Sequence, residues 1–121
     1  MSGVRPDEHL LVEADELILV SAGDPGDPPQ ETSLQFAYDD GVVYLLAPAA
    51  ADWCRGIQRD SGVVVRVKRR GFRGRVRLFD AKQRSKMVDR IAAMFKKKYG
   101  AGALKKLDLG ALLPVAVDVQ F

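Results

Sequence analysis

The fold is decided by residues 42–79, which read VVYLLAPAAADWCRGIQRDSGVVVRVKRRGFRGRVRLF. An apolar strand over residues 42–47 leads into a short helix that carries Trp53, and a second strand follows over residues 63–67. An arginine-rich ribbon comes next. This order of strand, short helix and antiparallel ribbon is neither a repeated βαβ unit nor a plain meander. It therefore restricts the fold much more than it restricts the reaction.

The rest of the chain predicts further strands and one long helix. The expected elements are a short helix over residues 9–17, strands over 16–22, 32–39 and 114–121, and a long helix over 81–100. Residues 23–31 hold three prolines and two glycines, so we expect a loop there. In the strand over residues 32–39, Leu34, Phe36 and Tyr38 share one face, and a turn at Gly41 makes it a hairpin with residues 42–47.

Two details of these elements are also predicted. The buried stripe of the long helix consists of Met87, Ile91, Met94 and Phe95. The arginine ribbon is interrupted at two glycines, Gly71 and Gly74.

A barrel is the most economical arrangement for six strands with a core of this size, because closing the sheet removes its exposed edge strands. We therefore predict an α+β protein: a six-stranded antiparallel split β-barrel with a short helix between strands and one long C-terminal helix. At 121 residues the chain is expected to form a single domain, residues 1–121.

Composition excludes several classes of function. The single cysteine, Cys54, and the single histidine, His9, argue against disulfide frameworks, zinc sites and histidine-based catalytic triads. No run of 18 apolar residues occurs and no signal-peptide pattern opens the chain, so we expect a cytoplasmic protein without a membrane partner.

Charge is segregated along the chain. Residues 1–40 hold ten acids and one base, a net charge of −9, whereas residues 41–121 hold eighteen bases and six acids, a net charge of +12. Opposite charges of this size attract each other, either within one chain or across the two-fold axis of a homodimer. The alternative interpretation is a positive field that serves an anionic partner.

The segments DDGVVYLLAP (residues 39–48), ADWCRGIQRDSGVVVRV (51–67) and KKKYG (96–100) resemble the flavin-binding split barrels, which include pyridoxamine-phosphate-oxidase-like proteins and deazaflavin-dependent nitroreductases. The resemblance spans roughly residues 17–121. It implies a homodimer with FMN or a deazaflavin coenzyme in clefts between the subunits, where barrel strands hold the ring and basic groups hold the phosphate.

The sequence departs from that family at the phosphate-binding loop. Nitroreductase-like members carry a basic G-R-K-S-G-x-x-R loop between their first two strands, whereas residues 23–31 hold Asp24, Asp27 and Glu31 and no base. Carboxylates beside a phosphate dianion repel it. Gly56 and Ser61 also stand where the family usually has Asn and Pro. A small anionic ligand would therefore need donors from elsewhere in the chain.

Seven residues are candidates for cofactor binding, and each has a structural alternative. Arg55, on the short helix, and Lys68 and Arg69, at the ribbon bend, are the basic candidates, with solvated or ion-paired surface positions as the alternative. Ser33 and Gln35 lie on the polar face of their strand. They either line a cleft or are simply exposed to water.

The two remaining candidates are aromatic. Trp53 is a cleft wall or a core residue, and Tyr99 is a cofactor contact or an apolar lid over the helix end. No catalytic residue is predicted.

Three hypotheses about function remain open. The first is a flavin- or deazaflavin-dependent oxidoreductase, in which the cofactor carries the hydride chemistry. The second is a cofactor-free split barrel that has kept the dimer and works as a binding or structural protein; a haem-binding variant would need His9 as axial ligand. The third, nucleic-acid binding by the arginine ribbon with Phe72 at its bend, is opposed by the acidic half of the chain.

Overall fold

A computed structural model of the chain describes residues 5–48, 50–100, 102 and 111–121. In chain order its elements are α1 (Glu8–Glu13), β1 (Glu16–Ser21), β2 (Gln30–Gln35), β3 (Ala37–Asp39), β4 (Val42–Pro48), α2 (Asp52–Arg59), β5 (Gly62–Val67), β6 (Arg70–Leu78), α3 (Ala81–Tyr99) and β7 (Leu112–Gln120).

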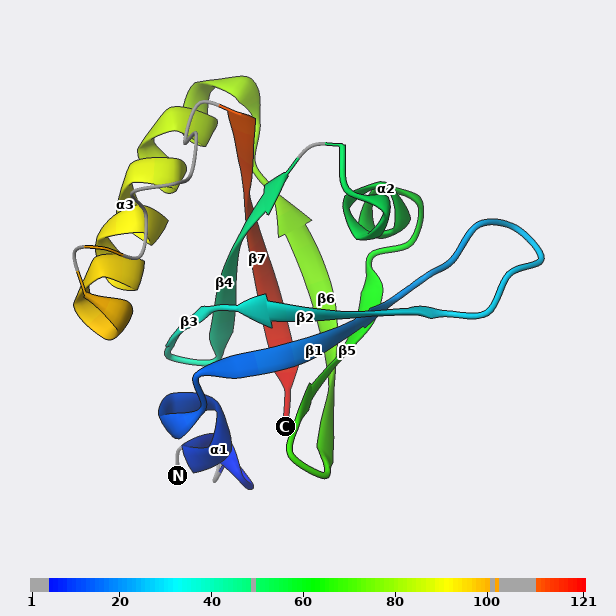
Figure 1. Cartoon of the computed structure of the whole chain (residues 1–121), viewed down its shortest axis with the longest axis horizontal. Coiled ribbons are helices and arrows are strands. Elements are labelled where there is room, and N and C mark those ends of the chain that lie inside the picture. The colour runs from blue at the N-terminus through cyan, green and yellow to red at the C-terminus, as the bar shows by residue number, and fades with distance from the viewer. Residues whose placement is uncertain (1–4, 49, 101, 103–110) are drawn as a thin grey trace.

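The strands form one antiparallel sheet in the order β2-β1-β5-β6-β7-β4-β3. The two edge strands, β2 and β3, are consecutive in the chain and are separated only by Phe36. The sheet therefore curls until its edges are joined through that residue, and Figure 1 shows the resulting half-barrel. The predicted class, α+β with an antiparallel split barrel, is confirmed.

The strand count differs from the prediction, because the described residues form a sheet of seven strands and not six. The single strand expected over residues 32–39 bends at Phe36, so its first part pairs with β1 and its second part pairs with β4. The predicted hairpin with residues 42–47 is confirmed by the pairing of Ala37 with Tyr44. The alternation of apolar side chains continues through the bend, so the sequence pattern hides it.

The bend is supported by the end of α3. The Tyr99 hydroxyl accepts the Phe36 N–H at 3.1 Å, and the Phe36 carbonyl accepts a hydrogen bond from Lys98 Nζ at 2.9 Å. A residue between two strands has no ladder partners, and buried backbone groups without partners are costly. Tyr99 and Lys98 thus supply the partners that the sheet does not give to Phe36.

The main core fills the inside of the curled sheet and is closed at both ends by short helices. From α1, Leu11 is fully buried, and from α2, Trp53, Cys54 and Ile57 point into the core. Figure 1 shows α1 and α2 at opposite ends of the barrel. The predicted helix over residues 9–17 ends earlier, at Glu13, because β1 already begins at Glu16.

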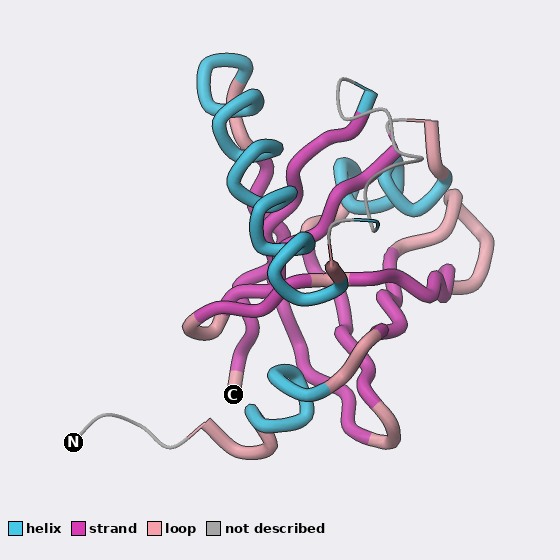
Figure 2. Tube along the Cα trace, turned by 60° about the vertical axis from the view of Figure 1, so that its left-hand side comes forward, coloured by secondary structure: helices cyan, strands magenta, loops and turns pink. Residues whose placement is uncertain are grey.

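The long helix α3 packs on the outside of the sheet, against β3, β4 and β7. Ile91 and Phe95 are buried there as predicted, whereas Met87 and Met94 are only partly buried, and Val88 and Ala92 complete the apolar face. In Figure 2 the helix lies along one side of the strands. Among the described residues, the main strand contacts of α3 do not include β1, β5 or β6.

The predicted interruption of the arginine ribbon was wrong, because β6 runs unbroken from Arg70 to Leu78. Gly74 lies within the strand. A Cβ at this position would lie 2.6 Å from Val117 Cγ1, so the close packing of β6 against Val117 requires glycine. Phe72, expected at the ribbon bend, is 1% exposed and belongs to the core.

The segregated charges pair within the chain. Ion pairs join Arg70 with Asp7 at 3.1 Å, Arg59 with Asp24 at 3.2 Å, and Arg66 with Glu31. Each of them links the acidic N-terminal part to the basic remainder, which is one of the two arrangements expected from the sequence. Of the helices in the described part of the chain, none has the length and apolar character needed to cross a bilayer.

Candidate functional site

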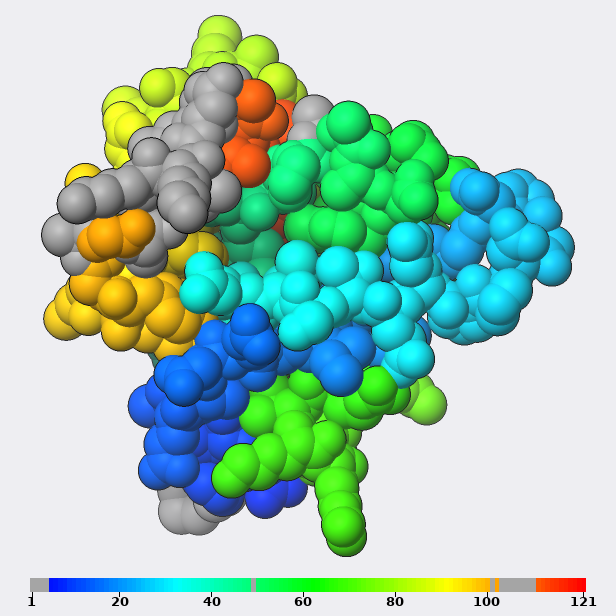
Figure 3. Space-filling model, in the orientation of Figure 1, coloured from blue at the N-terminus to red at the C-terminus, as the bar shows by residue number. Residues whose placement is uncertain are grey.

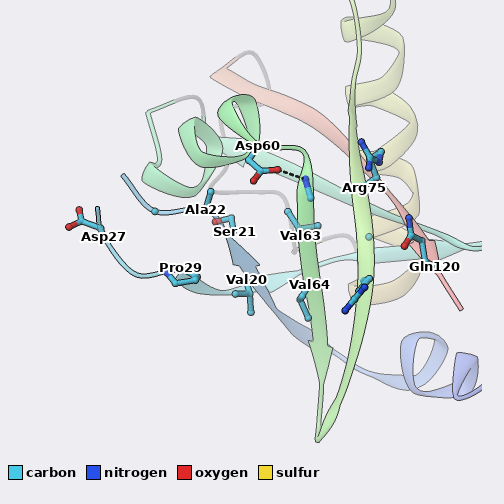
Figure 4. A pocket seen from close by; sticks show the side chains of 14 residues that line it. Val20, Ser21, Ala22, Asp27, Pro29, Asp60, Val63, Val64, Arg75 and Gln120 are labelled. Carbon is cyan, nitrogen blue, oxygen red and sulfur yellow. Dashed lines mark hydrogen bonds between the residues drawn. The ribbon is translucent and has the colours of Figure 1, made fainter. Parts of the chain in front are cut away.

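A groove of about 620 Å³ lies on the sheet face that α3 leaves uncovered. Its apolar floor is formed by Val20 and Val64, and its basic side by Arg73 and Arg75. In Figure 4, Arg75 lies at one end of the groove, and Asp27, from the loop after β1, lies at the other. Small-molecule sites commonly measure about 300–1,000 Å³, so the groove has the size of a ligand site.

Strand register assembles this surface from three separate segments. Val20 of β1 pairs with Val64 of β5, which in turn pairs with Arg73 of β6. In the next row of the sheet Gly62 pairs with Arg75. Since Gly62 has no side chain, the space beside Arg75 stays open.

The loop that closes the groove on one side is anchored by α2. Arg59 Nη2 donates to the Gly23 carbonyl at 2.7 Å, and its Nη1 pairs with Asp24 at 3.2 Å. Gly23 is required where it stands, because a Cβ would lie 2.2 Å from the Pro28 carbonyl oxygen. The space-filling view in Figure 3 shows this loop projecting from the body beside α2.

The contact between α2 and β1 leaves one buried hydroxyl without a partner. Gly56 brings the α2 backbone so close that a Cβ would lie 2.4 Å from the Ala22 carbonyl oxygen, which explains glycine at this position. Ser21, which borders the groove, is 2% exposed, and its Oγ has no hydrogen-bond partner among the described residues. An unpaired buried hydroxyl is costly. Because side chains alternate along a strand, this hydroxyl faces α2 and lies on the opposite side of β1 from Val20.

Two acidic residues also line the groove. Asp27 lies on the loop, and Asp60 follows α2, where its Oδ1 accepts the Gly62 N–H at 2.9 Å. A second cavity of about 360 Å³ lies beside the same loop and is lined by Asp24, Asp27 and Asp52, together with Arg59, which pairs with Asp24. Acids therefore outnumber bases around the loop, which is unfavourable for a phosphate.

In the structure, the basic residues named from the sequence as cofactor-binding candidates lie far from one another. Arg55 is exposed on α2 and pairs with Asp52 of the same helix. Lys68 and Arg69 form the exposed turn between β5 and β6. Since β5 has six residues and a strand rises about 3.3 Å per residue, the turn lies about 20 Å from the α2 end of β5.

The remaining candidates also lie apart from one another. Ser33 and Gln35 are exposed on β2, Trp53 is buried in the core, and Tyr99 supports the bend at Phe36. None of the seven predicted residues lines either of the two cavities. Within one chain these residues do not come together as one site.

Sequence reasoning missed the residues that do form the groove. Alternation along residues 73–77 already placed Arg73 and Arg75 on one face of a strand, but it could not show which strands flank them. The useful signal was Gly62, a glycine at the start of a strand without a positive φ angle. Such a glycine suggests a close approach by another group.

Comparison with known proteins shows the fold. No protein-family model and no curated protein matches the sequence. Among solved structures, an F420 reductase matches with a TM-score of 0.74 and 18% identity, over 98% of this chain and 97% of the other. A putative pyridoxamine 5'-phosphate oxidase from Listeria innocua matches with a TM-score of 0.71 and 15% identity, over 94% and 90% of the two chains.

A haem storage protein from Vibrio cholerae matches as well, with a TM-score of 0.72 and 12% identity, over 94% of this chain and 87% of the other. At these identities the likeness concerns the fold alone. The chain thus has the split-barrel fold of the flavin- and deazaflavin-binding proteins that its sequence resembles. His9, the residue that a haem would need, is exposed on α1.

Proposed function

We propose that this protein binds FMN or a deazaflavin coenzyme in the groove on β1, β5 and β6, and that it acts as an oxidoreductase on a substrate still to be identified. One observation carries the proposal. The groove combines an apolar floor with two arginines that form no ion pair within the described residues, on strands outside the main contacts of α3.

The residues of the groove fit such a cofactor. Val20 and Val64 offer an apolar surface to a flat ring, and the missing side chain at Gly62 leaves room for it. The coenzyme, when bound, supplies hydride transfer, while the chain binds it, orients it and excludes water. This division agrees with a sequence that offers no catalytic base or nucleophile.

The proposal includes a homodimer. Ile18, Val20 and Val64 share the outer face of β1 and β5 and are only partly buried in one chain. A second copy seated on this face would cover them and would give the open groove its missing wall. A two-fold contact of this kind uses the same patch on both subunits.

The alternative proposal is a cofactor-free barrel that keeps the dimer and serves as a binding or structural protein. The acidic loop favours it, because Asp24 and Asp27 stand where related proteins carry bases. Nucleic-acid binding by the ribbon loses support, since Arg66, Arg70 and Arg77 are engaged by acids of the same chain.

The experiment is the absorbance spectrum of the purified protein, followed by thermal melts with FMN or a deazaflavin coenzyme. We expect little copurified cofactor but a clear rise of the melting temperature at saturation. Linkage gives about 2.7 kcal/mol of added stability at a hundredfold excess over the dissociation constant. A colourless protein whose melting temperature neither coenzyme changes would favour the cofactor-free alternative.

A further inference from the structure

We infer that Arg73 and Arg75 form the anion-binding end of the groove and take over the phosphate contact that a basic loop makes in related proteins. The ligand class is a phosphate monoester carried on a neutral ring system. This inference deepens the proposed function and rests on it. It assigns a binding role to two residues on the outer face of β6, away from the loop after β1.

Arg73 and Arg75 are the arginines of β6 that have no acid partner among the described residues. Arg70 pairs with Asp7, and Arg77 pairs with Asp118. Both free arginines are exposed on the same face of the strand, about 7 Å apart along it. Two guanidinium groups at this spacing can both reach one phosphate group, and each can donate two parallel hydrogen bonds.

The position of Asp118 explains why Arg75 stays free. Asp118 is the cross-strand partner of Arg75 in the register of β6 and β7, so its carboxylate could pair with that arginine. Instead, both of its oxygens accept hydrogen bonds from Arg77, at 2.8 and 3.1 Å. The Arg77 guanidinium thus holds the nearest acid of β7 away from the groove.

The other basic groups near the groove are already engaged. Arg59 holds Gly23 and Asp24 of the loop, and Arg66 holds Glu31 of β2. Two acids also line the groove: Asp27, on the loop, repels an anion, and one oxygen of Asp60 accepts the Gly62 N–H. A phosphorylated ligand is therefore oriented in one way, with its phosphate at β6 and its neutral ring over Val64.

The experiment compares FMN with riboflavin by titration calorimetry on the wild-type protein, Arg75→Ala and Arg69→Ala. Only FMN carries the phosphate. The Arg75→Ala variant should bind FMN about 10- to 100-fold more weakly than the wild type, because it loses charge-assisted hydrogen bonds to the phosphate. Its affinity for riboflavin should be unchanged. Arg69→Ala is the matched control, because Arg69 is an exposed arginine in the turn at the far end of β5. We expect it to change neither affinity.

Two results would overturn the inference while leaving the flavin proposal intact. One is an unchanged preference for FMN over riboflavin in Arg75→Ala, and the other is a loss of that preference in Arg69→Ala. A parallel melt with inorganic phosphate separates the remaining cases. If neither flavin binds but phosphate stabilises the wild type and not Arg75→Ala, the anion site stands and the flavin proposal fails. If phosphate has no effect either, both fail.

Discussion

The Tyr99 hydroxyl lies 3.1 Å from the backbone nitrogen of Phe36 and 3.0 Å from its carbonyl oxygen, although the two residues are 63 positions apart. The same hydroxyl contacts the carbonyl of Asp15 just before β1. Lys98 Nζ lies 3.6 Å from the centre of the Phe36 ring. Two neighbouring side chains at the end of α3 thereby support the bend between β2 and β3.

Tyr99→Phe should lower the free energy of unfolding by about 1–3 kcal/mol, because it leaves the Phe36 N–H without a partner. Urea denaturation measures this. Tyr44→Phe is the matched control, since its hydroxyl makes no hydrogen bond within the described residues, and it should have little effect. Equal stabilities of the two variants would mean that the hydroxyl of Tyr99 does not support the bend. Tyr99 was a cofactor candidate from the sequence, so flavin binding by the variant should be measured as well.

A pH dependence is expected from the contact between α1 and the β3–β4 turn. The Tyr38 hydroxyl donates to the Glu8 carboxylate and accepts the Gly41 N–H at 3.0 Å, and Arg5 bridges Glu8 and Asp40. The hydrogen bond from Tyr38 lowers the pKa of Glu8 below its ordinary value. The contribution of Glu8 to the free energy of unfolding is therefore complete above the pKa of Glu8 in the unfolded chain. It is lost as pH falls through the lower pKa of Glu8 in the folded protein.

At alkaline pH the sign is reversed. Burial, and next the bond to Glu8, raise the pKa of Tyr38 to about 12. Its stabilising effect is complete below about pH 10, the ordinary value, and is lost between pH 10 and 12. Free energies of unfolding measured across the pH range test the acid and the alkaline loss of stability, and the ultraviolet titration of tyrosine tests the pKa of Tyr38. Glu8→Gln should reduce the loss of stability at acid pH. An unchanged pH dependence at acid pH in that variant would contradict the role given to Glu8.

Gly62→Val should abolish ligand binding without harming the fold. A Cβ at this position meets only Asp60 Oδ1, at 3.4 Å, and valine suits a strand better than glycine does. The branched side chain would then fill the space beside Arg75. We expect flavin binding to fall at least tenfold while the melting temperature stays equal or rises. Full binding by a folded Gly62→Val protein would place the ligand elsewhere.

Arg77→Ala is expected to weaken anion binding although Arg77 does not line the groove. Without its partner, the Asp118 carboxylate becomes free to pair with Arg75, its cross-strand neighbour. The double variant Arg77→Ala with Asp118→Asn should restore FMN affinity, because the competing carboxylate is then absent. Calorimetry on the single and double variants measures the effect. Equal weakening in both would show that Arg77 itself touches the ligand.

Light scattering at low and high salt tests the proposed homodimer. We expect a dimer at micromolar concentration, and Ile18→Asp should dissociate it by placing a charge on the outer face of β1. Val12→Asp is the control, because Val12 is 61% exposed on α1. A wild-type monomer at both salt concentrations would refute the dimer. Dissociation of the wild type at high salt alone would show that charge pairing supplies much of the contact energy.

Local pattern predicted most of the fold, because its information lies in nearby residues. The short helix that carries Trp53, now placed at Asp52–Arg59, and the long helix that ends before Gly100 both follow from spacing and end signals. The bend at Phe36 could not be predicted. It depends on Tyr99, a partner that is distant in sequence, while the alternation of Leu34, Phe36 and Tyr38 passes through it unchanged.

The candidate site was harder to predict than the fold, because it depends on which charges are already paired. In the sequence, Arg69, Arg70, Arg73 and Arg75 belong to one basic run. Only the three-dimensional structure shows that Asp7, beside α1, engages Arg70, while Arg73 and Arg75 line the groove. The expectation that the acidic loop disfavours phosphate rests on charge composition alone, and it stays a prediction.

A single bent strand supplies both edges of the sheet, and this limits how the protein can open. The segment from β2 to β3 connects the two edges of the sheet, and the hydrogen bond from the Phe36 N–H to Tyr99 holds it at its bend. Peeling β2 from β1 would pull on β3, and a slip of either strand by one residue would have to be matched by the other. Amide hydrogens of the two strands should therefore exchange with solvent together, as one cooperative opening.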